Sequence, residues 1–301
     1  MSKTAFLFPG QGAQSLGMGK QVYDSLPAAR QLFDEAGDIL GYNLAEICFQ
    51  GPVERLNSTA VSQPAIYVAS LAALAGLREH EPDIETTCVA TAGLSLGEYT
   101  ALAFAGALSF RDGLRVVERR GEAMQAASDA NPSGMVSVLG LELPVIEELC
   151  ASARQLGVMQ VANLLCPGNI VVSGNQAACA EIERLVQDKG GRTVRLTVAG
   201  AFHTELMKPA DQALAAVLAD IPIQPPRVPV WSNVDARPHT DPEEIRGLLV
   251  QQVLQPVLWE QTMRYLLGEG IDRFVEIGPG RVLAGLLKRV QRRVECRNVS
   301  A

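Results

Sequence analysis

Histidine and aromatic residues are scarce in this chain, which has three histidines and 5% aromatic side chains among its 301 residues. Its six cysteines are scattered without any C-x-x-C spacing and with few histidines near them. Neither a zinc site nor a disulfide framework is therefore expected, and we expect no bound metal. The cysteines are interpreted as reduced thiols of a cytoplasmic protein, or of an organellar matrix protein if a transit peptide has been removed.

Basic residues are also in deficit, because 26 Lys and Arg stand against 33 Asp and Glu and leave a formal net charge of −7. A nucleic-acid partner is not expected, since binding phosphates requires concentrated positive charge. The opening MSKTAFLFPG has too short an apolar run for a signal peptide. No stretch is expected to reach the roughly 18 apolar residues of a membrane span, so we expect a soluble protein without membrane insertion.

The remaining composition is that of a globular protein, with 48% hydrophobic and 20% charged residues, and the pattern of predicted strands and helices is that of an α/β fold. The apolar run 4–8 predicts a strand that enters a glycine turn, and residues 86–92 predict a second buried strand. A helix is predicted over 98–107. The chain is long enough for one large domain or for a domain with an insert.

Residues 131–198 have a pattern of predicted strands and helices that differs from that of the flanking segments. Strands are predicted over 135–140, 158–165, 170–174 and 192–198, and helices over 143–156 and 175–189. The order β-α-β-β-α-β is that of a ferredoxin-like unit. The flanking segments 1–130 and 199–301 each look incomplete alone, so the unit is interpreted as an insert in a core formed by both. That core resumes with a strand at 229–234, helices at 242–254 and 258–268, and a strand before Pro279.

Ser95 is the first candidate for chemistry, because Gly93-Leu94-Ser95-Leu96-Gly97 matches the G-x-S-x-G pattern of a nucleophilic serine. In a chain with 27 glycines this pattern can arise by chance. Its position between a predicted strand and a predicted helix is, however, the context that the motif requires. This context favours a catalytic role over an ordinary serine.

A serine nucleophile needs a base, and only three histidines are available. His80 and His239 lie in charged stretches that are most simply solvated loops. His203 lies in VAGAFHTELM, directly after the last strand of the insert, where the chain must return to the core along the cleft between the two parts. His203 is therefore the candidate base. No Asp or Glu suggests itself as the third member of a triad.

Arg120 is the candidate for substrate binding. At 100° per residue it projects among Val116, Val117 and Met124, on the apolar side of a helix predicted over 110–127 that begins after a possible Ser109 cap. Two interpretations stay open. The long side chain reaches water or a buried carboxylate, or it binds an anionic substrate through a two-pronged hydrogen bond.

The glycine-rich loop FPGQGAQSLGMG does not complete a dinucleotide-binding fingerprint, because Ser15 stands where the third glycine should be. A loop after the first strand can instead aim a backbone N–H at the oxyanion that develops when a serine attacks a carbonyl group. Gln11 and Leu96, the residue after the nucleophile, are the natural donors.

Eight segments carry a family resemblance, in the order FPGQGAQ, SQPAIY, GLSLGEYTALAFAGALS, RRGEAMQ, GAFHTELM, SNV, QPVLW and EIGPGRVL. With them the chain resembles, nearly end to end, the malonyl-CoA:acyl carrier protein transacylases of fatty acid synthesis. The resemblance implies an α/β-hydrolase-like core with a ferredoxin-like insert. It also implies transfer of a malonyl group from coenzyme A to a serine, and then to the phosphopantetheine thiol of the carrier protein. Malonyl-CoA and holo-acyl carrier protein are thus the implied substrate and partner, no further cofactor is implied, and we expect a monomer.

The resemblance also implies residue roles. Ser95 matches the acylated nucleophile, His203 the base, Arg120 the residue that holds the malonyl carboxylate, and Gln11 and Leu96 the oxyanion donors. Gln252 matches a glutamine whose backbone carbonyl orients the histidine, an assignment that could slip by one to Gln251.

Two positions bear on specificity. Phe202, directly before the histidine, goes with malonyl rather than methylmalonyl in related domains, a discrimination worth about 1–3 kcal/mol. Leu94 stands where many members have histidine. We expect the enzyme to stay active with leucine at this position, with altered packing around the side chain.

Three alternatives remain at this stage. A serine esterase or thioesterase would use the same Ser95 and His203 but would end with water. A non-catalytic carrier or scaffold component would not need Ser95, His203 and Arg120 together. An acyltransferase of the same family could also serve a polyketide pathway instead of fatty acid synthesis.

Overall fold

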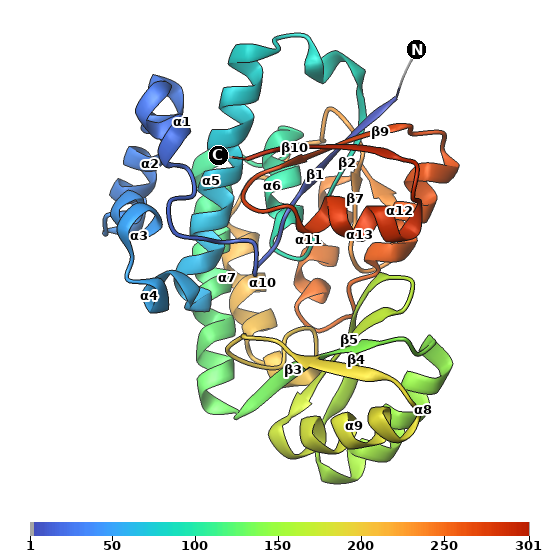
Figure 1. Ribbon diagram of the computed structural model, residues 1–301. Coiled ribbons are helices and arrows are strands. Elements are labelled where there is room, and N and C mark those ends of the chain that lie inside the picture. Colours follow the sequence, from blue (N-terminus) through green and yellow to red (C-terminus); the bar gives the residue numbers. More distant parts are fainter. Residues whose placement is uncertain (1–2, 301) are drawn as a thin grey trace.

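The computed structural model describes residues 3–300, which form an α/β fold built on two sheets. The larger sheet has the strand order β10-β9-β1-β2-β7-β8 (Figure 1). Its neighbouring strands run parallel except β7 and β8, which are antiparallel. The strands are β1 Thr4–Phe8, β2 Cys88–Gly93, β7 Val230–Trp231, β8 Pro238–His239, β9 Arg273–Ile277 and β10 Glu295–Val299.

Helices cover both faces of this sheet, and the central strand β1 shows why. All five of its residues are buried, as expected for a parallel strand between two helical layers. Phe6 and Phe8 pack in one core with helices α2, α5 and α7, whereas Ala5 and Leu7 pack in the other with α12 and α13. These helices are α2 Pro27–Leu40, α5 Thr59–His80, α7 Phe110–Ala130, α12 Trp259–Gly268 and α13 Val282–Val290.

Helix α5 is long and apolar enough, by length and composition, to cross a membrane, contrary to the expectation that no stretch would be. Its most apolar window has a mean hydropathy of 1.5, and 78% of that window is buried inside the protein. It belongs to the larger hydrophobic core, where residues from both of its faces are buried. The apolar surface of α5 is therefore covered by protein, as in the core helix of a globular fold.

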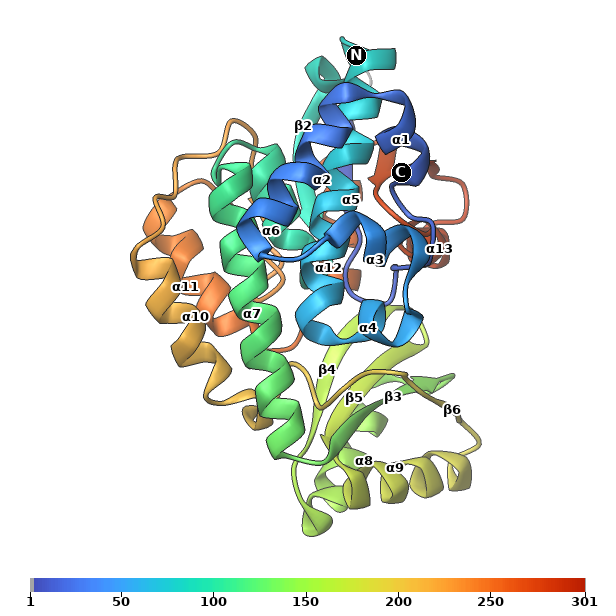
Figure 2. The ribbon, with the colours of Figure 1, turned by 90° about the vertical axis from the view of Figure 1, so that its left-hand side faces the viewer.

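The smaller sheet is antiparallel throughout and has the strand order β4-β5-β3-β6. Its strands are β3 Ser133–Leu139, β4 Met159–Cys166, β5 Asn169–Asn175 and β6 Arg192–Arg195. Helices α8 Leu143–Ala153 and α9 Gln176–Asp188 cover the face that points away from the larger sheet (Figures 1 and 2). Ala162 and Val171, from β4 and β5, belong to the main core.

The other helices are α1 Lys20–Ser25, α3 Leu44–Gln50, α4 Val53–Asn57, α6 Gly97–Phe104, α10 Ala210–Ala219 and α11 Pro242–Gln252. Short 3-10 turns lie at Ile84–Thr87, Arg154–Leu156 and Glu205–Met207. Figure 2 shows α7 running from the main body toward the smaller sheet.

The observed elements follow the predicted order, with differences at their ends. The strand predicted over 192–198 stops at Arg195, because β6 is an edge strand that pairs only with β3, and its ladder with β3 ends at the pair of Arg195 and Val136. The helix predicted over 143–156 ends as an α-helix at Ala153 and tightens into a 3-10 turn before Gly157, whose φ of 131° few other residues adopt.

Candidate active site

Ser95 lies in the turn between β2 and α6, as the sequence predicted. The flanking glycines are required by close packing. A Cβ on Gly93 would come within 1.9 Å of the carbonyl carbon of Gly97, and a Cβ on Gly97 would come within 2.1 Å of the Phe8 carbonyl oxygen. The G-x-S-x-G pattern therefore reflects a turn in which backbone touches backbone, both within the turn and against the end of β1.

The backbone of Ser95 is strained, with a φ of 51° that non-glycine residues rarely adopt. Hydrogen bonds hold it from both sides. Its N–H donates to the side-chain oxygen of Asn233 at 2.6 Å, and its carbonyl accepts from Nε2 of Gln252 at 3.0 Å. Strain of this kind persists only where the surroundings fix it, and it is common where a side chain must be presented for chemistry.

His203 reaches Ser95 from the segment after β6, with its Nε2 3.0 Å from the serine Oγ. Its Nδ1 lies 2.7 Å from the backbone carbonyl oxygen of Gln252. A carbonyl can only accept, so Nδ1 carries the proton and Nε2 presents its lone pair to the serine. Burial, together with the positive charge of Arg120, lowers the pKa of His203 to about 4. The imidazole is therefore neutral at pH 7 and competent as a base.

Arg120 is 1% exposed, so the interpretation that its side chain reaches water is wrong. Helix α7 begins as predicted, with the Ser109 side chain accepting from the Asp112 N–H. One terminal nitrogen of Arg120 donates to Gln63 at 2.7 Å. The other donates to Ser95 Oγ at 3.0 Å and to the Gln252 side-chain oxygen at 2.9 Å.

No carboxylate forms an ion pair with Arg120 anywhere in residues 3–300, so the alternative of a buried carboxylate partner also fails. The Nε–H has no hydrogen-bond partner among the same residues, and the guanidinium lies 5.4 Å from the centre of the Tyr99 ring. Burial lowers the pKa of Arg120. A buried cation without a counter-charge in contact, at hydrogen-bond distance from the serine, is suited to bind an anion there.

The two candidate oxyanion donors lie on adjacent turns. Gln11 follows β1, and Gly10 before it packs so closely on the serine turn that a Cβ would stand 2.2 Å from the Leu94 carbonyl oxygen. Leu96 follows Ser95 and precedes α6. Neither backbone N–H donates a hydrogen bond to another group in the part of the chain that is described. Their donor capacity is therefore not used by the described part of the protein.

Gln252 contributes its side chain to the site as well as its carbonyl oxygen. It is fully buried at the end of α11, and the structure selects it over Gln251, because its own carbonyl accepts from His203. Its side chain accepts from Arg120 and donates to Ser95 and to Glu98. Nothing in the sequence indicated this role of the side chain.

Glu98 and Asn233 were also missed. Glu98, three residues after the serine, is 3% exposed and accepts from the Gln252 side chain at 2.6 Å and from the Asn233 N–H at 3.1 Å. Asn233 holds the serine turn through its side chain, which also donates to the Gly93 carbonyl at 2.7 Å. One signal was available for Glu98, which stands in the otherwise apolar segment that became α6.

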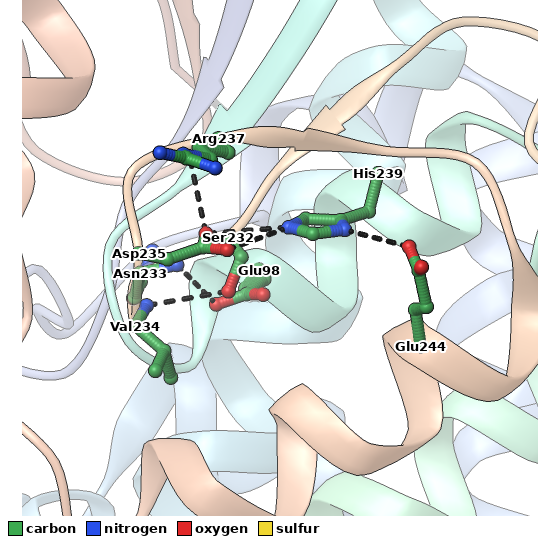
Figure 3. Close-up of polar contacts among 8 residues, drawn as sticks. All are labelled: Glu98, Ser232, Asn233, Val234, Asp235, Arg237, His239 and Glu244. Carbon is green, nitrogen blue, oxygen red and sulfur yellow. Dashed lines mark hydrogen bonds and ion pairs between the residues drawn. The ribbon is translucent and has the colours of Figure 1, made fainter.

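The other sequence candidates are Phe202, Leu94 and His239. The Phe202 ring is part of the main hydrophobic core, and Leu94 is partly buried against the smaller cluster of the larger sheet. His239 is no solvated loop residue, because its side chain is 15% exposed and lies between Asp235, at 3.0 Å, and Glu244, at 3.2 Å (Figure 3). No cluster of three or more His, Cys, Asp or Glu in residues 3–300 could hold a metal ion.

Comparisons with known proteins agree on one family. Residues 5–299 match the acyl transferase domain model. A malonyl CoA-acyl carrier protein transacylase of Bacillus subtilis is 43% identical over 304 aligned residues, which cover all of this chain and 94% of the relative.

Solved structures are equally similar. An acyl-carrier-protein S-malonyltransferase from Bartonella henselae superposes with a TM-score of 0.96 at 38% identity, covering 99% of this chain and 96% of the other. A malonyl-transacylase in complex with its type II PKS acyl-carrier protein has a TM-score of 0.94 at 37% identity, with 99% and 96% coverage.

Proposed function

The chain belongs to the acyl transferase family, and from this premise we infer that it is a malonyl-CoA:acyl carrier protein transacylase. The observation that carries the inference is the position of Arg120, whose guanidinium donates to Ser95 Oγ. In a malonyl ester of this serine, only one CH2 group separates the ester carbonyl carbon from the carboxylate. The guanidinium is thus within reach of the charge that distinguishes malonyl from acetyl.

We propose the following roles for the first half-reaction. His203 Nε2 takes the proton of Ser95 as Oγ attacks the thioester carbon of malonyl-CoA. The N–H groups of Gln11 and Leu96 donate to the oxyanion that forms. The carbon–sulfur bond then breaks, the coenzyme A sulfur takes the proton from His203, and malonyl remains on the serine as an ester.

The second half-reaction runs the same steps with a different thiol. The phosphopantetheine thiol of the carrier protein gives its proton to His203 and attacks the ester carbon. The serine leaves with the proton returned by His203, and malonyl departs as a thioester of the carrier. One thioester is exchanged for another, so the reaction needs no cofactor of the enzyme's own.

We propose that the Phe202 ring limits the size of the acyl group that fits beside His203. The support is its position directly before His203 in the chain.

The strand order β4-β5-β3-β6 with two helices on one face supports a ferredoxin-like insert over residues 131–198. The mostly parallel larger sheet with a serine turn after β2 supports an α/β-hydrolase-like core formed by residues 1–130 and 199–301. A monomeric state, a cytoplasmic or organellar-matrix location and the lack of a nucleic-acid partner stay predictions.

A polyketide carrier is a second candidate partner, because one of the similar structures is titled as a complex with a type II PKS carrier protein. A thioesterase is less well supported. The relative and the solved structures that the chain matches over nearly its whole length are named transacylases or malonyltransferases, not hydrolases.

The experiment that tests the function is an intact-mass measurement in two steps. Mixing the protein with malonyl-CoA should add the mass of one malonyl group, and this adduct should persist in buffer. Adding holo-acyl carrier protein should return the enzyme to its original mass and move the malonyl group to the carrier. Loss of the adduct to water before the carrier is added would indicate a thioesterase, and no adduct at all would contradict an acyl-enzyme mechanism. Parallel runs with a fatty acid carrier and a polyketide carrier separate the two partners.

A further inference from the structure

Glu98 is a buried titratable group for which the mechanism above has no use. It lies in the first turn of α6, underneath the loop that follows β7 (Figure 3). One carboxyl oxygen, Oε2, accepts from Nε2 of Gln252 at 2.6 Å and from the Asn233 N–H at 3.1 Å. Burying a carboxyl group this deeply costs folding free energy unless the group is hydrogen-bonded. Its position beside the serine turn therefore suggests a role in the site.

The contacts of Gln252 indicate what Glu98 does. The amide of a glutamine can face its partners in two orientations that exchange oxygen and nitrogen. The Glu98 carboxylate and the Ser95 carbonyl can only accept, so both require the NH2 group of Gln252. The guanidinium of Arg120 can only donate, and it receives the amide oxygen at 2.9 Å. All three partners agree on one orientation, and Glu98 makes the shortest of the bonds.

We propose that Glu98 is a positioning residue for malonyl recognition, because its carboxylate fixes the Gln252 amide with its oxygen toward Arg120. The proposal rests on the function proposed above. Glu98 thereby places a negative charge near the guanidinium without touching it, because the neutral amide of Gln252 lies between the two groups.

The indirect arrangement has a chemical advantage. A carboxylate in direct contact with Arg120 would occupy the donors that the malonyl carboxylate needs, and it would repel that second negative charge. A guanidinium buried without any nearby negative charge would be expensive to fold. The series of contacts from Glu98 through Gln252 to Arg120 satisfies both demands, and within residues 3–300 it leaves the Nε–H of the guanidinium without a partner.

Glu98 also supports the serine turn through Asn233, so its loss could act on structure alone. The test therefore requires a readout that a structural role would not move. That readout is the ratio of kcat/KM for malonyl-CoA to kcat/KM for acetyl-CoA, because acetyl has no carboxylate for Arg120 to hold. General damage to the serine turn would lower both values and leave the ratio unchanged.

The first variant is Glu98→Gln. Its amide oxygen can still accept from Gln252 and Asn233, as Oε2 of the carboxylate does, but it is a neutral acceptor and holds the Gln252 NH2 group less strongly. The Gln252 amide is then free to turn over and present NH2 to the guanidinium. The malonyl-to-acetyl ratio should then fall roughly tenfold or more, as expected when a hydrogen bond to a charged group is lost. The matched control is Glu276→Gln. Glu276 is a second buried carboxyl group, which accepts the Leu283 and Ala284 N–H groups at the start of α13. This control should lose stability and keep the wild-type ratio.

The second variant exchanges the two side chains, Glu98→Gln with Gln252→Glu. It keeps one carboxylate and one amide as partners, but it places the carboxylate directly against Arg120. The exchange should fold, should raise the KM for malonyl-CoA and should leave the ratio low. It tests the proposal even if Glu98→Gln does not fold.

An unchanged ratio in Glu98→Gln, or a wild-type ratio in the exchange, would overturn the proposal while the proposed function stands. Failure of the wild-type protein to take up malonyl from malonyl-CoA would overturn both.

Discussion

The Nδ1 atom of His203 lies 2.7 Å from the main-chain carbonyl oxygen of Gln252, the place that an aspartate takes in a Ser-His-Asp triad. A carbonyl fixes the tautomer as a carboxylate would, but it brings no negative charge to stabilise an imidazolium. This agrees with the environment of His203, where burial and Arg120 both oppose the charged ring. The orienting group is also part of the backbone, so it is independent of the side chain at position 252.

Gln252→Ala tests that independence. The carbonyl oxygen remains and keeps the tautomer, so acylation by acetyl-CoA should fall far less than the factor of about 10⁴ that follows replacement of a triad aspartate by asparagine, which allows the wrong tautomer. Malonyl transfer should fall further than acetyl transfer, because Arg120 loses an acceptor. The measurement is single-turnover acylation with both thioesters, with His203→Ala as the reference for loss of the base. A Gln252→Ala rate as low as that of His203→Ala would show that the side chain orients the histidine.

Arg120→Ala should separate the two thioesters most clearly. Removing a charge-assisted contact to a buried carboxylate should cost roughly 2–5 kcal/mol in kcat/KM for malonyl-CoA. Acetyl transfer should hold steady or rise, because an uncharged acyl group no longer meets an unpaired guanidinium. Arg120→Lys should recover only part of the malonyl activity, since an ammonium lacks the planar fork. Equal losses for both thioesters would mean that Arg120 is structural.

Gly97→Ala should disrupt the serine turn, because its Cβ would meet the Phe8 carbonyl oxygen at 2.1 Å, and backbone cannot give way as a flexible side chain can. A loss of at least about 1–3 kcal/mol in the free energy of unfolding is expected, together with most of the acylation activity. The control is Gly247→Ala in α11, where nothing lies within 4 Å of the new methyl group. It should be neutral or slightly stabilising, by up to about 1 kcal/mol. Similar losses in both variants would remove the argument from close packing.

The pH dependence should differ between the two thioesters. His203 stays neutral down to about pH 4, so acetyl transfer should show no loss between pH 7 and 5. Burial raises the pKa of Glu98 to about 7, so its carboxylate forms as pH rises through neutrality. The malonyl-to-acetyl ratio should therefore rise across pH 7 in the wild type and stay flat in Glu98→Gln. The titratable or charged groups around Glu98 include Tyr99 and Arg120, which interact with its charge, and His203, which contacts Gln252. Asp235, Arg237, His239 and Glu244 lie on the neighbouring loop and helix (Figure 3).

The same pKa shift has a consequence for stability. The folded protein holds the Glu98 proton more tightly than the unfolded chain, whose usual pKa is 4.5. The free energy of unfolding should therefore fall as pH rises from about 4.5 to about 7, and Glu98→Gln should lack this contribution. Urea unfolding of both proteins at several pH values gives the difference. His203 contributes the opposite slope below its usual value of 6.5, but it does so in both proteins and cancels.

The serine turn was accessible from sequence, because its signals are local. Glycines at fixed spacing and a strand followed by a helix are written in adjacent residues, and the helix position of Arg120 follows from a regular period. His203 was found by elimination in a chain with three histidines. Gln252 came only from the resemblance to a family.

The supporting residues could not be predicted, because their roles depend on contacts across long stretches of chain. Glu98 and Gln252 are 154 positions apart, and Asn233 reaches Ser95 across 138. In sequence, Glu98 differs from an ordinary acid in the first turn of a helix only because the rest of its segment is mostly apolar. Its burial arises only when α11 and the loop after β7 close over it. His239 was misjudged for a different reason. Asp235 and Glu244 are only four and five residues away in sequence, but they flank the imidazole only in the folded turn around β8.

The most direct test of the account is to locate the malonyl group on the protein. After brief mixing with malonyl-CoA and proteolysis, tandem mass spectrometry should find a single malonyl group on the peptide that contains Ser95, and Ser95→Ala should carry none. A malonyl group on any other residue of the wild type, or continued acylation of Ser95→Ala, would contradict the assignment of Ser95 as the nucleophile.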